Sequence, residues 1–228
     1  HPAGLSIRPW QPMSPNQRLL MLALVVVAGF VPLVAGNYVL TVLAEIAVFA
    51  LFAASLHFLM TVGGLASFGH AAYFGLGAYG AAFATTMFGA PMVASLLLGP
   101  LLGVAGAILF GWFCVRLSGV YFAMLTLAFA QIAWSIAFQW VEVTGGDNGI
   151  LGVWPASWAS SPAAFYWLAL AVSVAGIAAL RVLVFSPFGY ALRATRDSAL
   201  RSEAIGIDRA RVQWAAFIIA GTFAGIAG

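Results

Sequence analysis

The sequence predicts an all-α integral membrane protein, a polytopic bundle of transmembrane helices. Of its 228 residues, 64% are hydrophobic and only 7% are charged, and the mean hydropathy is +1.05. These values lie outside the range of soluble globular domains. Several apolar runs approach the roughly 20 residues that a helix needs to cross a bilayer core about 30 Å thick. The alternating segments of about 10 residues that are typical of a membrane β-barrel are absent from the sequence.

The order of polar and apolar segments predicts one transmembrane domain, 19–228, after a proline-rich N-terminal arm at 1–18. We expect six complete spans and a seventh within which the sequence ends, so that further C-terminal spans are expected to be missing. The expected spans are 19–35, 38–61, 65–88, 92–115, 120–141, 163–185 and 212–228.

Individual spans carry distinctive features. The run at 19–35 is short and crosses only with some thinning of the bilayer or help from its flanks. The run at 65–88 is rich in Gly and Ala, which let helices approach closely. Gly99 and Gly103 in the fourth span have the same spacing as small-residue helix contacts. Cys114 is at the end of that span. Because the sequence has no second cysteine with which it could form a disulfide, we expect an inert thiol that faces lipid or another helix.

The positive charges predict the orientation of the chain. All nine are arginines, and with a cytoplasmic N-terminus they all fall on the inner side, as the positive-inside rule expects. This placement also accounts for the basic pI without a nucleic-acid partner. The arginines are Arg8, Arg18, Arg116, Arg181, Arg193, Arg196, Arg201, Arg209 and Arg211.

Polar groups inside the expected spans are candidates for a translocation pathway. Ionisable groups in a bilayer are costly and normally face a bundle interior or a cavity. Glycine-interrupted segments often line transport pathways, and Ser67 and His70 mark a point where the backbone can be broken. For Glu45, His57 and Gln131 the alternative is hydrogen bonding within the bundle, and for the glycine-rich segment it is a tight structural contact that does not touch a substrate. The candidates are Glu45, His57, Ser67, Gly69, His70, Gly75, Gly77 and Gln131.

The outer loop holds the sequence TGGDNGI, at 144–150. Its Gly, Asp and Asn are strong turn formers. The following Trp154 and Trp158 are expected to anchor at the membrane interface. A lone D-N-G falls far short of a calcium loop, and no metal site is expected.

The cytoplasmic loop at 186–211 holds eight of the charges of the chain. It predicts a break at 186–189 and then an amphipathic helix over about 191–205 that ends at Gly206. Asp197 precedes Arg201 by four residues, the favourable order for a helix pair. A surface helix on water or anionic lipid is the plain alternative to a docking helix. No nucleotide-binding or hydrolase motif occurs, so the chain is not expected to be an enzyme or to hydrolyse ATP.

Several ordered motifs resemble a known family. They are GGLASFGHAAYFGLGAY, SGVYFAMLTLAFAQ, TGGDNGI, SPFGYALRATRDSALRSEAIGID and AFIIAGTFAGIAG. From Tyr38 to Gly228 the chain resembles the LivM-type permease subunit of branched-chain amino acid ABC importers. It is also similar to the related permeases of urea and short-chain amide importers. Where the family usually reads RDNE, this chain has Arg196, Asp197, Ser198 and Ala199.

The resemblance implies a multi-pass subunit of the bacterial inner membrane. Its implied partners are a second related permease, a pair of cytoplasmic ABC ATPases that bind ATP and magnesium, a periplasmic substrate-binding protein and membrane lipid. This chain itself binds no cofactor on that view. The resemblance implies a coupling helix that docks on the ATPase, through Arg193, Arg196, Asp197, Arg201, Glu203, Ala204, Gly206 and Ile207.

The implied function is ATP-driven import of branched-chain or other hydrophobic amino acids. The binding protein would deliver its solute at the outer loop, at Gly145, Gly146, Asp147 and Asn148. Import of urea or short-chain amides is the alternative. A passive channel is a further alternative, as is an intramembrane enzyme that uses Glu45, His57 and His70 as acid and base groups.

Overall fold

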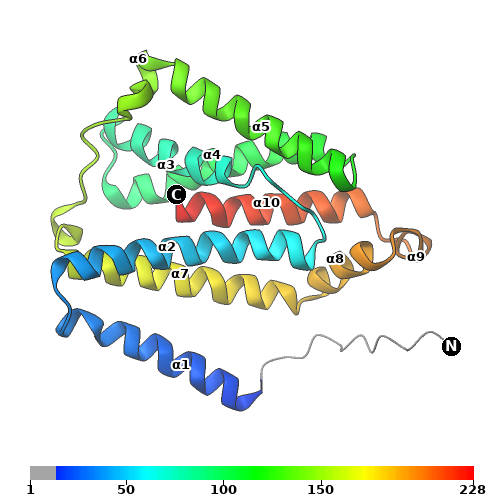
Figure 1. Ribbon diagram of the computed structural model, residues 1–228, viewed down its shortest axis with the longest axis horizontal. Coiled ribbons are helices and arrows are strands. Elements are labelled where there is room, and N and C mark those ends of the chain that lie inside the picture. The colour runs from blue at the N-terminus through cyan, green and yellow to red at the C-terminus, as the bar shows by residue number, and fades with distance from the viewer. Residues whose placement is uncertain (1–13) are drawn as a thin grey trace.

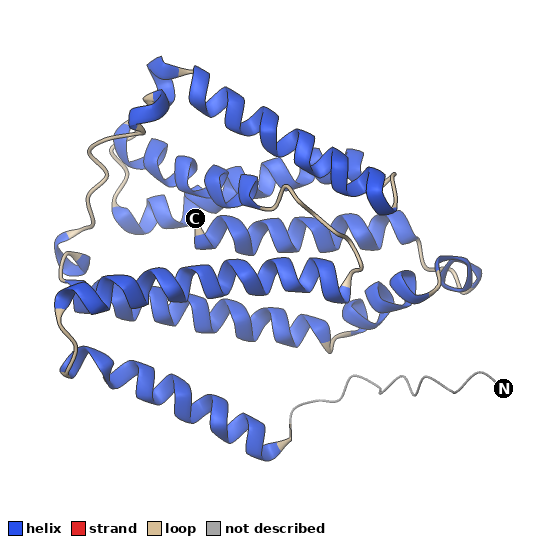
Figure 2. Cartoon of the chain, in the orientation of Figure 1, coloured by secondary structure: helices blue, strands red, loops and turns tan. Residues whose placement is uncertain are grey.

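The computed structural model describes residues 14–228, and within them every regular element is helical, which confirms the predicted all-α membrane fold. Figure 2 shows helices joined by loops throughout this part of the chain. Residues 1–13 of the expected N-terminal arm lie outside the described residues. The rest of that arm is helical, because Ser14 and Gln17 form a capping box at the start of α1 (Pro15–Phe30).

Six of the described helical segments are long and apolar enough to cross a membrane. They are Pro15–Leu33, Asn37–Val62, Met92–Cys114, Gly119–Gln139, Pro162–Val184 and Arg209–Ala227. The first combines α1 with a 3-10 turn, η1 (Val31–Leu33), and the second combines α2 (Asn37–His57) with a π-helical turn, η2 (Phe58–Val62). The others are α4 (Met92–Cys114), α5 (Gly119–Gln139), α7 (Pro162–Val184) and α10 (Arg209–Ala227).

At residues 65–88 the structure differs from the predicted span. Its helix, α3 (Ala71–Thr86), has only 16 residues, and residues 64–70 before it are not helical. The reason is local: the π-helical turn η2 leads into Gly63 and Gly64, and Gly64 has a φ of +68°, which stops the helix. The chain therefore passes through the bundle as irregular backbone before α3 begins.

Short elements occupy the two ends of the bundle (Figure 1). At one end lie α6 (Val141–Thr144), η3 (Gly146–Asn148) and η4 (Ser157–Ala159). At the other end lie α8 (Pro187–Asp197) and α9 (Ala199–Ala204). Arg116 and Arg209 are at the α8 and α9 end, where they line one cavity. The charged loop and the glycine-rich outer loop are thus on opposite sides of the bundle.

Helices α3, α4 and α10 pack closely because glycines face one another. A side chain on Gly77 would collide with the backbone of Gly225 in α10. A side chain on Gly80 would lie 2.6 Å from the carbonyl oxygen of Gly99 in α4. Such small-residue contacts are the usual means of close helix association in lipid. The side chain of Cys114 is fully buried in the same core, so the thiol faces helices and not lipid.

A second packing unit joins α2 to α7 through a cluster that includes Leu40, Ala44 and Tyr166. Helix α1 lies outside it and has no buried residue. Its ties to α7 are two hydrogen bonds, from the Tyr166 hydroxyl to the Ala28 carbonyl (2.8 Å) and from the Trp167 indole to the Gly29 carbonyl (3.1 Å). Aromatic residues thus attach α1 to the bundle by polar contacts and little packing.

Candidate functional site: a membrane cavity and a charged helix pair

A cavity of about 510 Å³ lies between α3, α5 and the outer loop. We call it the outer cavity. Its walls are mostly apolar, and the polar side chains of Tyr79, Gln131, Trp134 and Asp147 are distributed along them. It is lined by Phe68, Ala71, Ala72, Gly75, Leu76, Tyr79, Leu127, Ala130, Gln131, Ala133, Trp134, Ala137, Phe138, Gly146 and Asp147. A concave, mainly apolar site with a few polar groups is typical of small-molecule binding.

The inner end of this cavity is built by the irregular backbone before α3. The Phe68 amide donates to the Thr126 hydroxyl of α5 (3.1 Å), and that hydroxyl donates to the Ala123 carbonyl (2.8 Å). Gly69 packs so closely on the Thr126 backbone that no side chain would fit. Irregular backbone within a membrane protein is tolerated where it is buried in protein or lines a cavity, and this segment does both.

Ser67 and His70 are buried in that segment, with their side chains 3% and 2% exposed. His70 Nε2 lies 2.8 Å from the Ser55 hydroxyl of α2. The Ser67 hydroxyl and His70 Nδ1 are buried without a hydrogen-bond partner among the described residues. The predicted point of backbone breakage is therefore real, and both residues lie at it.

The other predicted pathway residues separate into three groups. Gly75 and Gln131 line the outer cavity. Gly77 is on the opposite, buried side of α3, where it packs on α10. Glu45 and His57 are exposed on the surface of α2 and line neither cavity described in this section. The structure thus brings Gly75 and Gln131 together and leaves the two ionisable residues of α2 apart from them.

The outer loop is shaped by glycines. Gly145, Gly146 and Gly149 have φ values of +76°, +57° and +68°, which other residues rarely adopt. The Thr144 hydroxyl bonds carbonyls at the end of α5, and it accepts the Gly146 amide (3.2 Å). Asp147 and Asn148 are exposed at the tip. The turn predicted from this sequence is present, and it places Asp147 at the mouth of the outer cavity.

The charged loop at 186–211 contains two short helices where one was expected. Ser186 caps α8 by accepting the Gly189 amide (3.3 Å), and Pro187 takes the first helical position, so the expected break at 186–189 is the first turn of a helix. Ser198 has extended backbone and separates α8 from α9. Because of this separation, Asp197 does not pair with Arg201. Asp197 pairs with Arg196 at 2.8 Å, and Arg201 donates to the Ser198 hydroxyl (3.2 Å).

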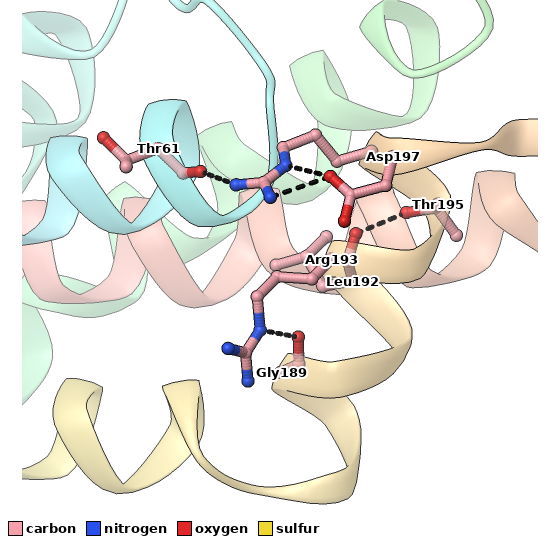
Figure 3. Close-up of polar contacts among 7 residues, drawn as sticks. Thr61, Gly189, Leu192, Arg193, Thr195 and Asp197 are labelled. Atoms are coloured by element: carbon pink, nitrogen blue, oxygen red, sulfur yellow. Dashed lines mark hydrogen bonds and ion pairs between the residues drawn. The ribbon is translucent and has the colours of Figure 1, made fainter. Parts of the chain in front are cut away.

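Two arginines of α8 donate to backbone carbonyls of the membrane-spanning segments, and Figure 3 shows one of them, Arg193, with its contact to Gly189. Arg193 is buried and donates to the Gly189 carbonyl (3.2 Å) and to the Val184 carbonyl at the end of α7 (2.8 Å). Its guanidinium also lies 4.4 Å from the centre of the Tyr190 ring. Arg196 donates to the Thr61 carbonyl in η2. Arg193 and Arg196, two residues of the expected docking set, therefore make hydrogen bonds within the chain itself.

The remaining predicted docking residues lie on or after α9. Arg201, Glu203, Ala204 and Gly206 are exposed, and Ile207 is partly exposed. Sequence reasoning missed two large apolar side chains beside them, Leu200 and Ile205, which are 83% and 75% exposed. The sequence could have indicated them, because both are aliphatic residues within the most polar segment of the chain.

A second cavity, of about 650 Å³, lies between the α4–α5 turn and the segment that joins α9 to α10. It is lined by Val115, Arg116, Leu117, Ser118, Glu203, Gly206, Ile207, Asp208, Arg209 and Ala210. It therefore includes three residues of the predicted docking set. Within residues 14–228, no group of three or more His, Cys, Asp or Glu side chains is placed to hold a metal ion.

Comparison with known proteins identifies the family. Residues 38–228 match the family described as "Branched-chain amino acid transport system / permease component". The high-affinity branched-chain amino acid transport system permease protein LivM of Salmonella typhimurium and that of Escherichia coli K12 are each 25% identical to this chain over 240 residues. Each alignment covers 93% of this chain and 56% of the relative, so the chain spans about half the length of these curated relatives.

No solved structure shows significant similarity to this chain. The family match covers all the described residues from Tyr38 onward, including the outer cavity, the loop at 144–150 and the helices α8 and α9. Both relatives are described as transport system permeases. The chain is a multi-pass membrane protein that belongs to the family of branched-chain amino acid transport system permease components.

Proposed function

We propose that this chain is a membrane-spanning subunit of an ATP-driven importer and that the outer cavity is part of its solute pathway. The observation that carries the proposal is the course of this cavity, which runs from the irregular backbone at Phe68 to the outer loop at Asp147. The proposed solute is a branched-chain or other hydrophobic amino acid, since the family and the named relatives carry that description.

The chemistry of the cavity suits such a solute. Apolar walls along α3 and α5 accommodate an aliphatic side chain, and the Asp147 carboxylate at the mouth attracts an ammonium group. The first turn of α3 lines the inner end, and the positive end of a helix dipole favours a carboxylate. Urea or a short-chain amide is the second candidate, because Gln131 offers both a donor and an acceptor for an amide.

The proposed ATPase contact is the exposed surface of α9 and the residues after it. Leu200 and Ile205 supply apolar contact area, and Arg201 and Glu203 supply charge around it. Apolar anchors within a polar rim are the usual composition of a docking surface. ATP and magnesium are held by the ATPase on this proposal and not by this chain.

Two further partners are proposed, a substrate-binding protein and a second permease. A substrate-binding protein docks on the outer loop at Gly145, Gly146, Asp147 and Asn148. A second permease covers exposed membrane-facing surface of this one, and the exposed Glu45 on α2 supports this, because an acidic group on a span is rarely left to lipid. Arginine placement supports a bacterial inner-membrane location with the N-terminus in the cytoplasm.

The experiment is uptake into proteoliposomes that contain the full-length chain and its assembled partners. We expect uptake of radiolabelled leucine that requires ATP, and a smaller or absent uptake of radiolabelled urea. Gly75→Leu fills the outer cavity and should reduce uptake about tenfold or more. Gly29→Leu, on the peripheral helix α1, is the control and should transport normally. Uptake without ATP, or normal uptake by Gly75→Leu, contradicts the proposal.

A further inference from the structure

Arg196 connects the cytoplasmic helix α8 to the end of the second membrane span. It lies in the last turn of α8, and its Nη1 donates to the backbone carbonyl of Thr61 in η2. The same guanidinium is held from its other side by Asp197, with Nε and Nη2 each 2.8 Å from the carboxylate oxygen Oδ1. A guanidinium held on two sides has a fixed position, because its donors form a rigid fork.

The Thr61 carbonyl is available because the span ends in a π-helical turn. The amides of Gly64 and Leu65, which follow it, bond the carbonyls of Met60 (3.1 Å) and Leu59 (3.2 Å). A terminal helical carbonyl without a backbone donor needs another partner, and the negative end of a helix favours a cation there. Arg196 provides both the donor and the charge.

Gly64 gives the arginine room to reach that carbonyl. A side chain on Gly64 would collide with Cγ of Arg196 and lie 3.1 Å from its Cδ. The φ of Gly64 is +68°, so a larger residue would also be strained in its backbone. The aliphatic stem of Arg196 therefore lies directly on Gly64, at the point where the span becomes irregular.

Helix α8 is fixed to the bundle on its other sides as well. Leu192 is fully buried in the main core and lies 3.6 Å from the position of a Gly63 side chain. Arg193 bonds the Val184 carbonyl at the end of α7. These contacts hold α8 against α7 and η2, and Arg196 is its polar connection to η2.

The segment that Arg196 contacts leads directly to the outer cavity. Only residues 63–70 separate η2 from α3, and Phe68, Ala71 and Ala72 line the inner end of the cavity. The Phe68 amide is bonded to Thr126 of α5. A short piece of chain therefore joins η2 to the wall of the cavity.

We infer that Arg196 is a positioning residue that transmits movement of α8 to the inner end of the outer cavity, through the Thr61 carbonyl and Gly64. The inference rests on the proposed transport function but adds a distinct role for this arginine. Docking on the ATPase is assigned to α9, and Arg196 couples the docked helix pair to the pathway.

The first test separates coupling from docking in the assembled, full-length transporter. We expect Arg196→Ala to keep its ATPase subunits and ATP hydrolysis but to move about tenfold less solute per ATP, the size expected for loss of a charge-assisted hydrogen bond. Gly64→Ala should give the same defect, since it displaces the arginine. Arg211→Ala is the matched control, because Arg211 pairs with its neighbour Asp208 (3.0 Å) and is 85% exposed. Loss of ATPase capture by Arg196→Ala, or an unchanged solute-to-ATP ratio, overturns the inference.

The second test needs no partner and therefore stays informative if the proposed function fails. A cysteine at Phe68 reports access to the inner end of the cavity, and the native Cys114 is fully buried. We expect Arg196→Ala and Gly64→Ala to change the maleimide labelling rate of F68C in the full-length membrane-embedded chain by several-fold, and Arg211→Ala to leave it within about twofold. An equal labelling rate in all variants overturns the inference, whereas a wild type without ATP-driven uptake counts only against the proposed function.

Discussion

The hydroxyl of Ser55 lies 2.8 Å from Nε2 of His70 and joins the second span to the start of α3. The same hydroxyl donates to the Phe52 carbonyl at 2.7 Å. Because a serine has one hydroxyl proton, Ser55 accepts from an Nε2–H of His70. In a neutral imidazole this contact places the proton on Nε2 and leaves Nδ1 as an acceptor. The contact is buried from both sides and fixes where α3 begins.

The first prediction concerns this contact. His70→Ala and Ser55→Ala should each lower the free energy of unfolding, by roughly 0.5–2 kcal/mol, because interhelical hydrogen bonds in membrane proteins are worth little more than this. The double variant should lose less than the sum of the two. Unfolding in mixed detergent measures all three. Ser160→Ala, at an exposed position outside the bundle, is the control, and strictly additive losses would contradict the prediction.

The second prediction separates two glycines of α3. Gly77→Ala should lower the free energy of unfolding by about 1–3 kcal/mol, because its methyl group would overlap the backbone of Gly225. Gly75→Ala meets nothing within 4 Å and should leave stability unchanged. Thermal unfolding of both variants in the same detergent gives the comparison. Equal melting temperatures would show that α3 and α10 are not in close contact.

A third prediction addresses the attachment of α8 to α7. Arg193→Ala removes the bonds to the Gly189 and Val184 carbonyls and should destabilise the fold by about 1–3 kcal/mol, as loss of a buried charged donor does. Limited proteolysis should cut residues 186–211 faster in this variant. Arg201→Ala provides the comparison, because Arg201 is exposed and donates to its near neighbour Ser198 within the same loop. Similar cutting rates in the two variants would contradict the prediction.

The fourth prediction tests the docking role of α9. Leu200→Ser should weaken capture of the ATPase about tenfold or more, because truncation of an apolar anchor typically costs over 1 kcal/mol of binding free energy. Leu200 is 83% exposed, so the free energy of unfolding should stay within about 0.5 kcal/mol of wild type. Pull-down with ATPase subunits measures the first quantity and thermal unfolding the second. Full capture by the variant would remove α9 from the docking surface.

Much of the fold could be predicted because lipid imposes strong rules on sequence. The expected span at 38–61 agrees closely with Asn37–Val62, and the one at 163–185 with Pro162–Val184. The start of the helix in the third span could not be predicted. The composition of 65–88 shows that the segment is apolar, but it does not show that Gly64 has a left-handed backbone conformation. The single helix expected at 191–205 was also wrong. Nothing in the local sequence announces the extended backbone of Ser198, which depends on how α8 and α9 pack on the bundle.

The candidate site also contains residues whose location could be predicted from the sequence and residues whose location could not. Gly75 and Gln131 lie at the outer cavity, and His70 lies at the break, while their role in a pathway stays a prediction. The positions of Glu45, His57 and Gly77 relative to the cavity depend on the side of the helix to which each residue points. Glu45 and His57 point to the surface of α2 although ionisable groups usually face inward, and Gly77 faces α10. Contacts between distant segments, such as Phe68 with Thr126 or Arg196 with Thr61, carry no signal in one sequence, because each depends on three-dimensional packing.

The left-handed glycines of the outer loop have a consequence for recognition. The three glycines permit this backbone shape, and the hydrogen bonds of the Thr144 hydroxyl hold it, so Asp147 and Asn148 are presented on a preformed surface. A partner that binds there loses little affinity to the ordering of this loop, because the conformational entropy was already given up when the chain folded. The identity of the tip residues can therefore change, and with it the choice of partner, while the shape of the loop stays the same.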